Sequence, residues 1–175
     1  MDDYLEVLNF IVDNILDWNT SEDEDPWNKE DPLDEDNAFF LNPDVAFPDN
    51  PGVYIFKSLD CGDIYYIGET DRTLHERLKY KQRNDYTSNG YSINGAYPPS
   101  LIRYANENTI IHTISIPPNI SSEKLEDVLL AAHKIKYGNR PEGNFSGGEE
   151  GVGWAEENPQ IEDLLIWLAE NVLDF

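Results

Sequence analysis

Two tyrosines and an arginine lie close together in the sequence, with side chains suited to chemistry on a phosphate. Residues 52–54 read Gly-Val-Tyr, residues 66–68 read Tyr-Ile-Gly, and the run Glu-Thr-Asp-Arg-Thr-Leu-His-Glu-Arg-Leu follows directly. A phenol has a pKa of about 10, so it is a poor base at neutral pH unless nearby cations assist it. A guanidinium offers several coplanar donors, which suit it to hold phosphate oxygens and to stabilise developing negative charge.

A β-hairpin is predicted to position the two tyrosines. Residues 52–57 and 63–68 have the composition of strands, and the turn between them contains Gly62, which can adopt a positive φ. A hairpin centred near Asp60 places Tyr54 roughly opposite Tyr66. Strict alternation puts Tyr54, Phe56, Ile64 and Tyr66 on one face of the sheet, and Val53, Ile55, Tyr65 and Ile67 on the other.

A helix is predicted to follow the hairpin and to carry the arginine. Thr70 or Asp71 caps this helix, which runs to about Arg83. Leu74, Arg77, Leu78 and Lys81 follow one another at i, i+3, i+4 and i+7, which places Arg77 and Lys81 on one face of the helix.

The remaining elements of the middle of the chain follow in order. Residues 84–97 are predicted to form a loop, residues 99–105 a short helix and residues 109–116 the third strand. A further helix begins at Ser121 or Ser122 and ends near Tyr137, before Gly138.

The two ends of the chain carry acidic segments. Residues 3–18 predict an amphipathic helix, residues 20–37 a linker or solvated loop, and the lead-in up to residue 51 an extended segment. Residues 143–153 are predicted to be a glycine-rich loop, and a final acidic helix begins at Asn158 or Pro159 and runs to Phe175. The predicted domains are therefore 1–19, 20–50, 51–147 and 148–175, of which the third carries the chemistry.

The order of these motifs resembles the GIY-YIG nuclease superfamily over roughly residues 51–147. The resemblance implies an α+β fold: a small three-stranded antiparallel sheet flanked by helices, here with added acidic N- and C-terminal helices. It also implies hydrolysis of phosphodiester bonds with one divalent metal, Mg²⁺ or Mn²⁺, per active site.

The resemblance assigns roles to the tyrosines and the arginine. Tyr54 would accept a proton from the attacking water or orient it, and Tyr66 would hydrogen-bond within the same site. Arg77 would hold the phosphate. Lys81, His75 or the metal would assist the tyrosines, and Arg72, the rival of Arg77, would contact the DNA backbone or solvent.

The same resemblance assigns the metal ligand to a helix. Glu126, followed by Leu129 and Leu130 and later by Asn144, fits the family pattern, with Asn144 tying the following loop to the site. Asn139 is the alternative to Asn144. Counting back from Asn144 by the commonest family spacing reaches Ala132 instead, which would mean a lost ligand and an inactive enzyme. A single carboxylate with water and substrate oxygens is a normal way to hold Mg²⁺.

The distribution of charge along the chain affects whether it can bind a polyanion such as DNA. The chain has a formal net charge of −23, which opposes binding of a polyanion. Residues 1–50 hold 16 acidic side chains and one basic side chain, and residues 142–175 hold 9 acidic and no basic ones. The middle, residues 51–141, holds 11 basic and 10 acidic side chains. Its basic residues form two clusters: Arg72, Arg77, Lys79, Lys81 and Arg83, and Lys134, Lys136 and Arg140.

Composition indicates a cytoplasmic, intracellular protein that does not enter a membrane. Hydrophobic residues make up 39 % of the 175, enough for a core, and the single cysteine, Cys61, excludes an internal disulfide. The first residues lack a basic signal region, and no apolar run reaches transmembrane length.

We therefore expect a metal-dependent DNA endonuclease, which would need dimerisation, two nicks or a tethered module to cut both strands. The alternative is a catalytically weak or inactive module of the same fold, whose acidic surface binds a basic partner or mimics DNA. Adaptation to high salt is another explanation for the acidity, although it should also have acidified the middle of the chain.

Overall fold

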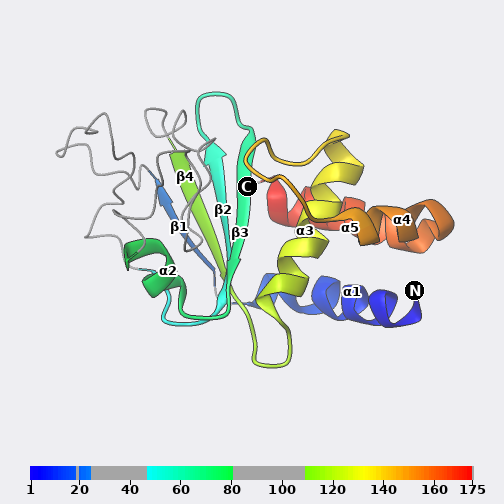
Figure 1. Ribbon diagram of the computed structural model, residues 1–175, viewed down its shortest axis with the longest axis horizontal. Coiled ribbons are helices and arrows are strands. Elements are labelled where there is room, and N and C mark those ends of the chain that lie inside the picture. The colour runs from blue at the N-terminus through cyan, green and yellow to red at the C-terminus, as the bar shows by residue number, and fades with distance from the viewer. Residues whose placement is uncertain (19, 25–46, 81–108, 175) are drawn as a thin grey trace.

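The computed structural model, which describes residues 1–18, 20–24, 47–80 and 109–174, has a four-stranded antiparallel sheet with helices on both faces (Figure 1). In chain order, the strands are β1 (Thr20–Glu24), β2 (Gly52–Ser58), β3 (Ile64–Thr70) and β4 (Thr109–Ser115). The spatial order is β1-β4-β2-β3, so β3 is an edge strand.

The helices divide between the two faces of the sheet. Helix α2 (Leu74–Tyr80) lies on one side, and the other helices form a thick layer on the opposite side (Figure 1). That layer consists of α1 (Asp2–Asn14), α3 (Ser122–Tyr137), α4 (Glu149–Glu157) and α5 (Pro159–Leu168). A 3₁₀ turn, Ile15–Asp17, extends α1, and a π-helical turn, Ala169–Leu173, extends α5. None of the described helices is both long and apolar enough to cross a bilayer.

The predicted fold class is confirmed, and the sheet has one strand more than predicted. The three predicted strands form the antiparallel unit β3-β2-β4. The fourth, β1, lies in the segment predicted to be a linker and pairs with β4, with Thr20 opposite Ile114. Because β1 reads Thr-Ser-Glu-Asp-Glu and carries no apolar alternation, its pairing through backbone hydrogen bonds left no signal in the sequence.

The hairpin forms, but its register differs from the predicted one. Tyr54 lies opposite Gly68, and Tyr66 lies opposite Phe56. A bulge after Phe56 then pairs Lys57 with Ile64, which leaves Tyr65 as an extra residue. The predicted faces of two residues are therefore exchanged: Ile64 joins the core beneath the helices, and the ring of Tyr65 contacts Phe56 at 5.8 Å.

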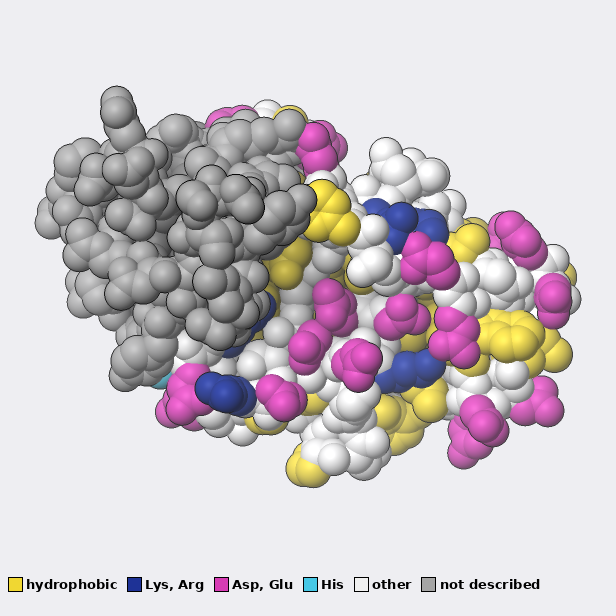
Figure 2. All heavy atoms as spheres, in the orientation of Figure 1, with side chains coloured by type: hydrophobic (Ala, Val, Ile, Leu, Met, Phe, Trp, Pro, Cys, Tyr) yellow, Lys and Arg dark blue, Asp and Glu magenta, His cyan; other side chains and the backbone are white. Residues whose placement is uncertain are grey.

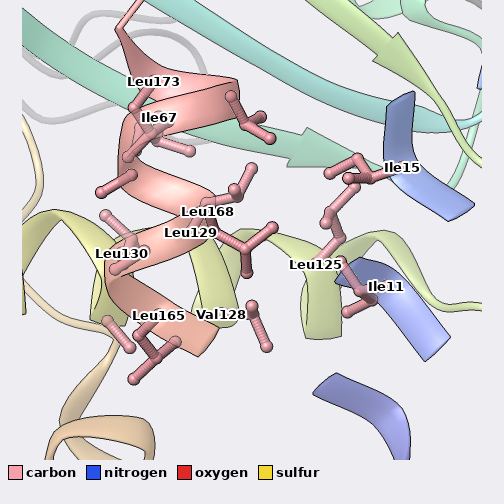
Figure 3. Close-up of a cluster of buried hydrophobic side chains, with 14 of the residues drawn as sticks. Ile11, Ile15, Ile67, Leu125, Val128, Leu129, Leu130, Leu165, Leu168 and Leu173 are labelled. Carbon is pink, nitrogen blue, oxygen red and sulfur yellow. The ribbon is translucent and has the colours of Figure 1, made fainter. Parts of the chain in front are cut away.

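Helix α3 lies at the centre of the hydrophobic core, between the sheet and the outer helices (Figure 3). Ser121 caps its start by accepting a hydrogen bond from the Lys124 amide at 3.1 Å, and Gly138, with φ of 80°, ends it. Both predicted ends are thereby confirmed. Buried side chains from three helices and β3 meet around it, including Ile11, Ile15, Ile67, Leu125, Val128, Leu129, Leu165 and Leu168. Residues outside 51–147 thus supply much of the layer that covers α3.

Helix α4 lies in a segment predicted to be a loop. Its glycines suggested a flexible connection, but Gly151 is required by packing: a Cβ there would lie 2.2 Å from Tyr4 Oη and 2.6 Å from Ala131 Cβ. The small residue therefore lets α1, α3 and α4 approach closely. The predicted short helix over residues 99–105 and the loop over 84–97 lie outside the described residues.

Candidate active site

The ring of Tyr54 lies over Gly68, which brings its hydroxyl to the edge strand β3. A Cβ on Gly68 would lie only 2.6 Å from Tyr54 Cζ, Tyr54 Oη and Tyr66 Cε1. Residue 68 must therefore lack a side chain for the two rings to occupy their positions. The rings of Tyr54 and Tyr66 are 6.0 Å apart, and Phe56 packs edge-on against Tyr54 at 5.9 Å.

Arg77 reaches the same hydroxyl from α2. Its Nε donates a hydrogen bond to Tyr54 Oη at 2.9 Å, and its Cζ lies 5.8 Å from the Tyr54 ring centroid. Leu74 and Leu78 are fully buried and hold α2 against the sheet, and the amide of Leu74 also bonds the Asn50 carbonyl at 2.8 Å. The burial of these leucines directs the intervening Arg77 toward the tyrosines.

The two phenols also act on each other, in the direction that favours the anion of Tyr54 over that of Tyr66. Burial raises the pKa of Tyr54, while the charge of Arg77, the Arg77 hydrogen bond and the Tyr66 hydrogen bond each oppose that rise. Burial, together with the neighbouring Tyr54 and Glu126, raises the pKa of Tyr66 well above its ordinary value. Because Arg77 donates to Tyr54 Oη and its charge lies close by, Tyr54 is the phenol whose anion is better stabilised.

Glu126 interacts electrostatically with this group from α3. Its pKa is raised to about 7, first by burial and then by the charges of Glu69, Asp127 and Glu123, while Arg77 acts in the opposite direction. Ala132, the alternative reached by counting from Asn144, is fully buried in the hydrophobic core. The geometry therefore favours Glu126 as the carboxylate of this site.

Sequence reasoning missed one neighbour of Glu126, the carboxylate of Glu69. The hydroxyl of Ser122 donates to Glu69 Oε2 at 2.5 Å, which joins the end of β3 to the first turn of α3, one turn before Glu126. The sequence did contain a signal for this residue. Glu69 directly follows Gly68, and strand alternation places it on the same face of the sheet as its partner Val53.

Asn144 ties its loop to β3, as the resemblance implied. Its side chain accepts from the Ile67 amide at 2.9 Å and donates to the Ile67 carbonyl at 2.7 Å. The amide of Gly143 donates to the Tyr65 carbonyl at 2.7 Å. Asn139, the alternative, lies beyond the end of α3, where its carbonyl bonds His133.

The auxiliary residues are not brought to the Tyr54 hydroxyl in the same way. His75 lies on α2 and bonds the Pro48 carbonyl through its backbone amide. Arg72 is exposed in the turn before α2, where its backbone amide bonds Thr70 Oγ1 at 3.1 Å. Lys81 lies outside the described residues.

The second predicted basic cluster is neutralised by the C-terminal segment. Ion pairs join Lys134 to Glu149 at 3.6 Å and Lys136 to Asp174, and Arg140 also pairs with Glu149 at 2.5 Å. Acidic side chains are also spread over the helical face of the molecule (Figure 2). This cluster therefore does not form an open cationic groove for DNA.

The chemistry of the carboxylates fits a hard divalent cation. Glu126 offers oxygen ligands, as Mg²⁺ and Mn²⁺ prefer, and the charges of Glu69 and Asp127 add negative potential there. No three His, Cys, Asp or Glu side chains in the described ranges form a metal-ligating group. An ion there would be held by Glu126 with water and substrate oxygens.

A cavity of about 400 Å³ lies beside Glu126; its lining includes the acidic residues Glu123, Glu126, Asp127 and Glu150, together with Lys124 and uncharged residues of α3 and the loop before α4. Tyr54 and Arg77 do not line it. Comparison of the chain with protein-family models, with curated proteins and with solved structures gave no match. The assignment of function therefore depends on the motif and on the geometry of these side chains.

Proposed function

We propose that this chain is a divalent-metal-dependent DNA endonuclease of the GIY-YIG type. The observation that carries the proposal is the hydrogen bond from Arg77 Nε to Tyr54 Oη at 2.9 Å, made where Tyr66 and Glu126 also act on Tyr54. Two phenols and a guanidinium thus converge from β2, β3 and α2, and the carboxylate of Glu126 on α3 acts on them electrostatically. Structural packing alone gives no reason for this combination.

In the proposed reaction, water attacks phosphorus, the bond to the leaving sugar oxygen breaks, and that oxygen takes up a proton. Arg77 stabilises the negative charge that develops on the phosphate, because a preformed cationic donor is most effective in a partly buried site. Tyr54 orients the water at neutral pH, and its phenolate accepts the proton as the pH rises. Tyr66 supports that phenolate by donating to it.

The metal, when bound at Glu126, supplies positive charge that neutralises the substrate phosphate. Glu126 must be ionised to hold it, and burial, followed by the carboxylates around it, raises its pKa to about 7 in the protein without metal. Glu69 remains bonded to Ser122 and so positions the first turn of α3.

Access to Tyr54 constrains this proposal. Tyr54 is fully buried, whereas Tyr66, Arg77 and Glu126 are half-buried. The proposed substrate therefore meets Arg77, Tyr66 and Glu126 first, and contact of water with Tyr54 Oη requires a local rearrangement around the ring.

A second candidate function is favoured by the charge distribution. Residues 141–174 contain no Lys, Arg or His, and described cations of α3 pair with acids of that segment. An acidic module that binds a basic protein would have these properties. The burial of Ala132 in the hydrophobic core argues against it, since an inactive site would have placed Ala132 beside the tyrosines.

Plasmid cleavage tests the proposal directly. The full chain is incubated with supercoiled DNA and Mg²⁺ or Mn²⁺, alongside Arg77→Ala, Glu126→Gln and a control, Glu156→Gln, in the exposed part of α4. We expect metal-dependent nicking by the native chain and the control, and at least 100-fold slower nicking by the other two. Equal activity in all four, or activity that persists in EDTA, would refute it.

A further inference from the structure

A second cavity lies at the opposite end of the hairpin from the Gly68 site. It has a volume of about 590 Å³, within the range of small-ligand pockets. The hairpin turn, the last turns of α3 and the loop after α3 line it, with Leu173 from the C-terminal segment. From Glu126 to Tyr137 the helix rises about 16 Å, so this cavity is separate from the candidate active site.

The loop wall of the cavity is preformed. Gly138 takes up a left-handed conformation and turns the chain back, so that the Asn139 carbonyl meets His133 Nδ1 at 2.7 Å. Pro141 is buried, and the Gly143 amide bonds the Tyr65 carbonyl on β3. These contacts fix the loop to the sheet.

His133 presents an acceptor to this cavity. Only 6 % of its surface is exposed, and because a carbonyl can only accept, Nδ1 carries the proton in the bond to Asn139. In the neutral ring, Nε2 is then an acceptor, and it has no hydrogen-bond partner among the residues described. Within the described residues, Tyr4 Oη, Ser115 Oγ and Asp127 Oδ2 are fully enclosed without a partner, whereas Nε2 is not enclosed in this way. It therefore opens onto the cavity that His133 lines.

The charges around the cavity favour a cation. Asp63 lines it on the hairpin side and acts electrostatically on His133, yet its carboxylate has no hydrogen-bond or ion-pair partner within the described residues. The one arginine of the lining, Arg140, is paired with Glu149. Burial lowers the pKa of His133, which keeps the ring neutral and able to accept.

The aromatic lining favours a planar cation over a compact one. Tyr137 supplies the exposed ring of this lining: it is 43 % exposed, packs against His133 with centroids 4.6 Å apart, and has Lys136 Nζ 5.4 Å from its centroid. Tyr65 also lines the cavity but is buried against Phe56. Planar guanidinium groups stack on such rings and donate several hydrogen bonds in one plane, whereas an ammonium acts as a point charge.

We propose that this cavity receives an arginine side chain of a basic partner protein, whose guanidinium donates to His133 Nε2 and Asp63. The high negative charge of the chain would steer such a partner toward it. The proposal concerns a site separate from the candidate active site and holds whether or not the chain cleaves DNA.

Nuclear magnetic resonance of the full chain tests the proposal, with N-acetyl-arginine amide as the probe. N-acetyl-citrulline amide has nearly the same shape and no charge. We expect the arginine probe to shift the His133 imidazole resonances with millimolar affinity, and the citrulline probe to bind at least 10-fold more weakly. Equal affinity of the two probes, or no shift at His133, would overturn the proposal.

Two variants on the same hairpin turn localise the interaction. Asp63→Asn removes the cavity carboxylate at an exposed position, and Asp60→Asn is its matched control outside the lining. We expect at least a 5-fold loss of arginine-probe affinity for the first and no change for the second. Equal effects would overturn the proposal, and so would a single-stranded oligonucleotide that shifts His133 when the arginine probe does not.

Discussion

Asn144 pairs with Ile67 as if it were one residue of a further strand, because its side-chain amide both accepts from and donates to the backbone of Ile67. Ile67 is the central residue of the Tyr-Ile-Gly motif and lies on β3, which is an edge strand of the sheet formed by the described residues. One side chain thus satisfies two edge groups and fixes the strand that carries Tyr66 and Gly68.

Replacing Asn144 should therefore affect both stability and the site. Asn144→Asp keeps the acceptor for the Ile67 amide but removes the donor for the Ile67 carbonyl. We expect a loss of about 1–3 kcal/mol in the free energy of unfolding, measured by urea denaturation. Asn171→Ala, which removes an exposed bond to the Trp167 carbonyl, is the control and should cost under about 0.5 kcal/mol. Similar losses in both variants would show that the hydrogen bonds to Ile67 contribute no more to the free energy of unfolding than an exposed side-chain bond does.

Gly68→Ala should disrupt the arrangement of the two tyrosines. Its Cβ would meet the Tyr54 and Tyr66 rings at 2.6 Å, so the rings must move, at a cost of about 1–3 kcal/mol. Gly153→Ala is the matched control, because nothing lies within 4 Å of its Cβ and the helical alanine should stabilise slightly. Thermal unfolding of both variants measures the difference, and an unchanged Tm for Gly68→Ala would contradict the packing described for the tyrosines.

Glu126→Gln should be more stable than the native chain at alkaline pH. Since the folded-state pKa is raised from 4.5 to about 7, the folded protein holds a proton that the unfolded chain releases between these values. The native chain therefore loses stability as pH rises from 4.5 to 7, whereas glutamine does not titrate. We expect a gain of about 3 kcal/mol at pH 8 and a smaller one at pH 5. A gain independent of pH would contradict the proximity of the other carboxylates.

The neutralised basic cluster should contribute little to DNA binding. Lys134→Ala removes a cation that is already paired with Glu149, so affinity for a short duplex should change by less than about 2-fold. Arg77→Ala should weaken binding by 10-fold or more at low salt. Fluorescence anisotropy measures both, and a larger loss for Lys134→Ala would place the DNA along the C-terminal half of α3.

Motif spacing and hydrophobic periodicity were sufficient to predict the three central strands and the ends of α3. The family resemblance, rather than these patterns, pointed to Asn144, whose contact with β3 the structure shows. The register could not be predicted: Tyr54 lies opposite Gly68, two residues from the expected Tyr66, and the bulge at Tyr65, which alternation alone does not reveal, accounts for one of those two residues. Strand β1 and helix α4 were missed for a related reason. Their formation depends on an available edge of β4 and on the close approach of Tyr4 to Gly151, which are tertiary contacts.

The central claim is that Tyr54 and Arg77 act as one unit on a phosphate, and a double-mutant cycle of cleavage rates tests it most directly. Single-turnover nicking is measured for the native chain, Tyr54→Phe, Arg77→Ala and the double variant, in Mg²⁺. If the two residues act together, the double variant will be about as slow as the slower single variant, because removal of either disables the unit. Rate losses that multiply, or full activity in Tyr54→Phe, would contradict the claim.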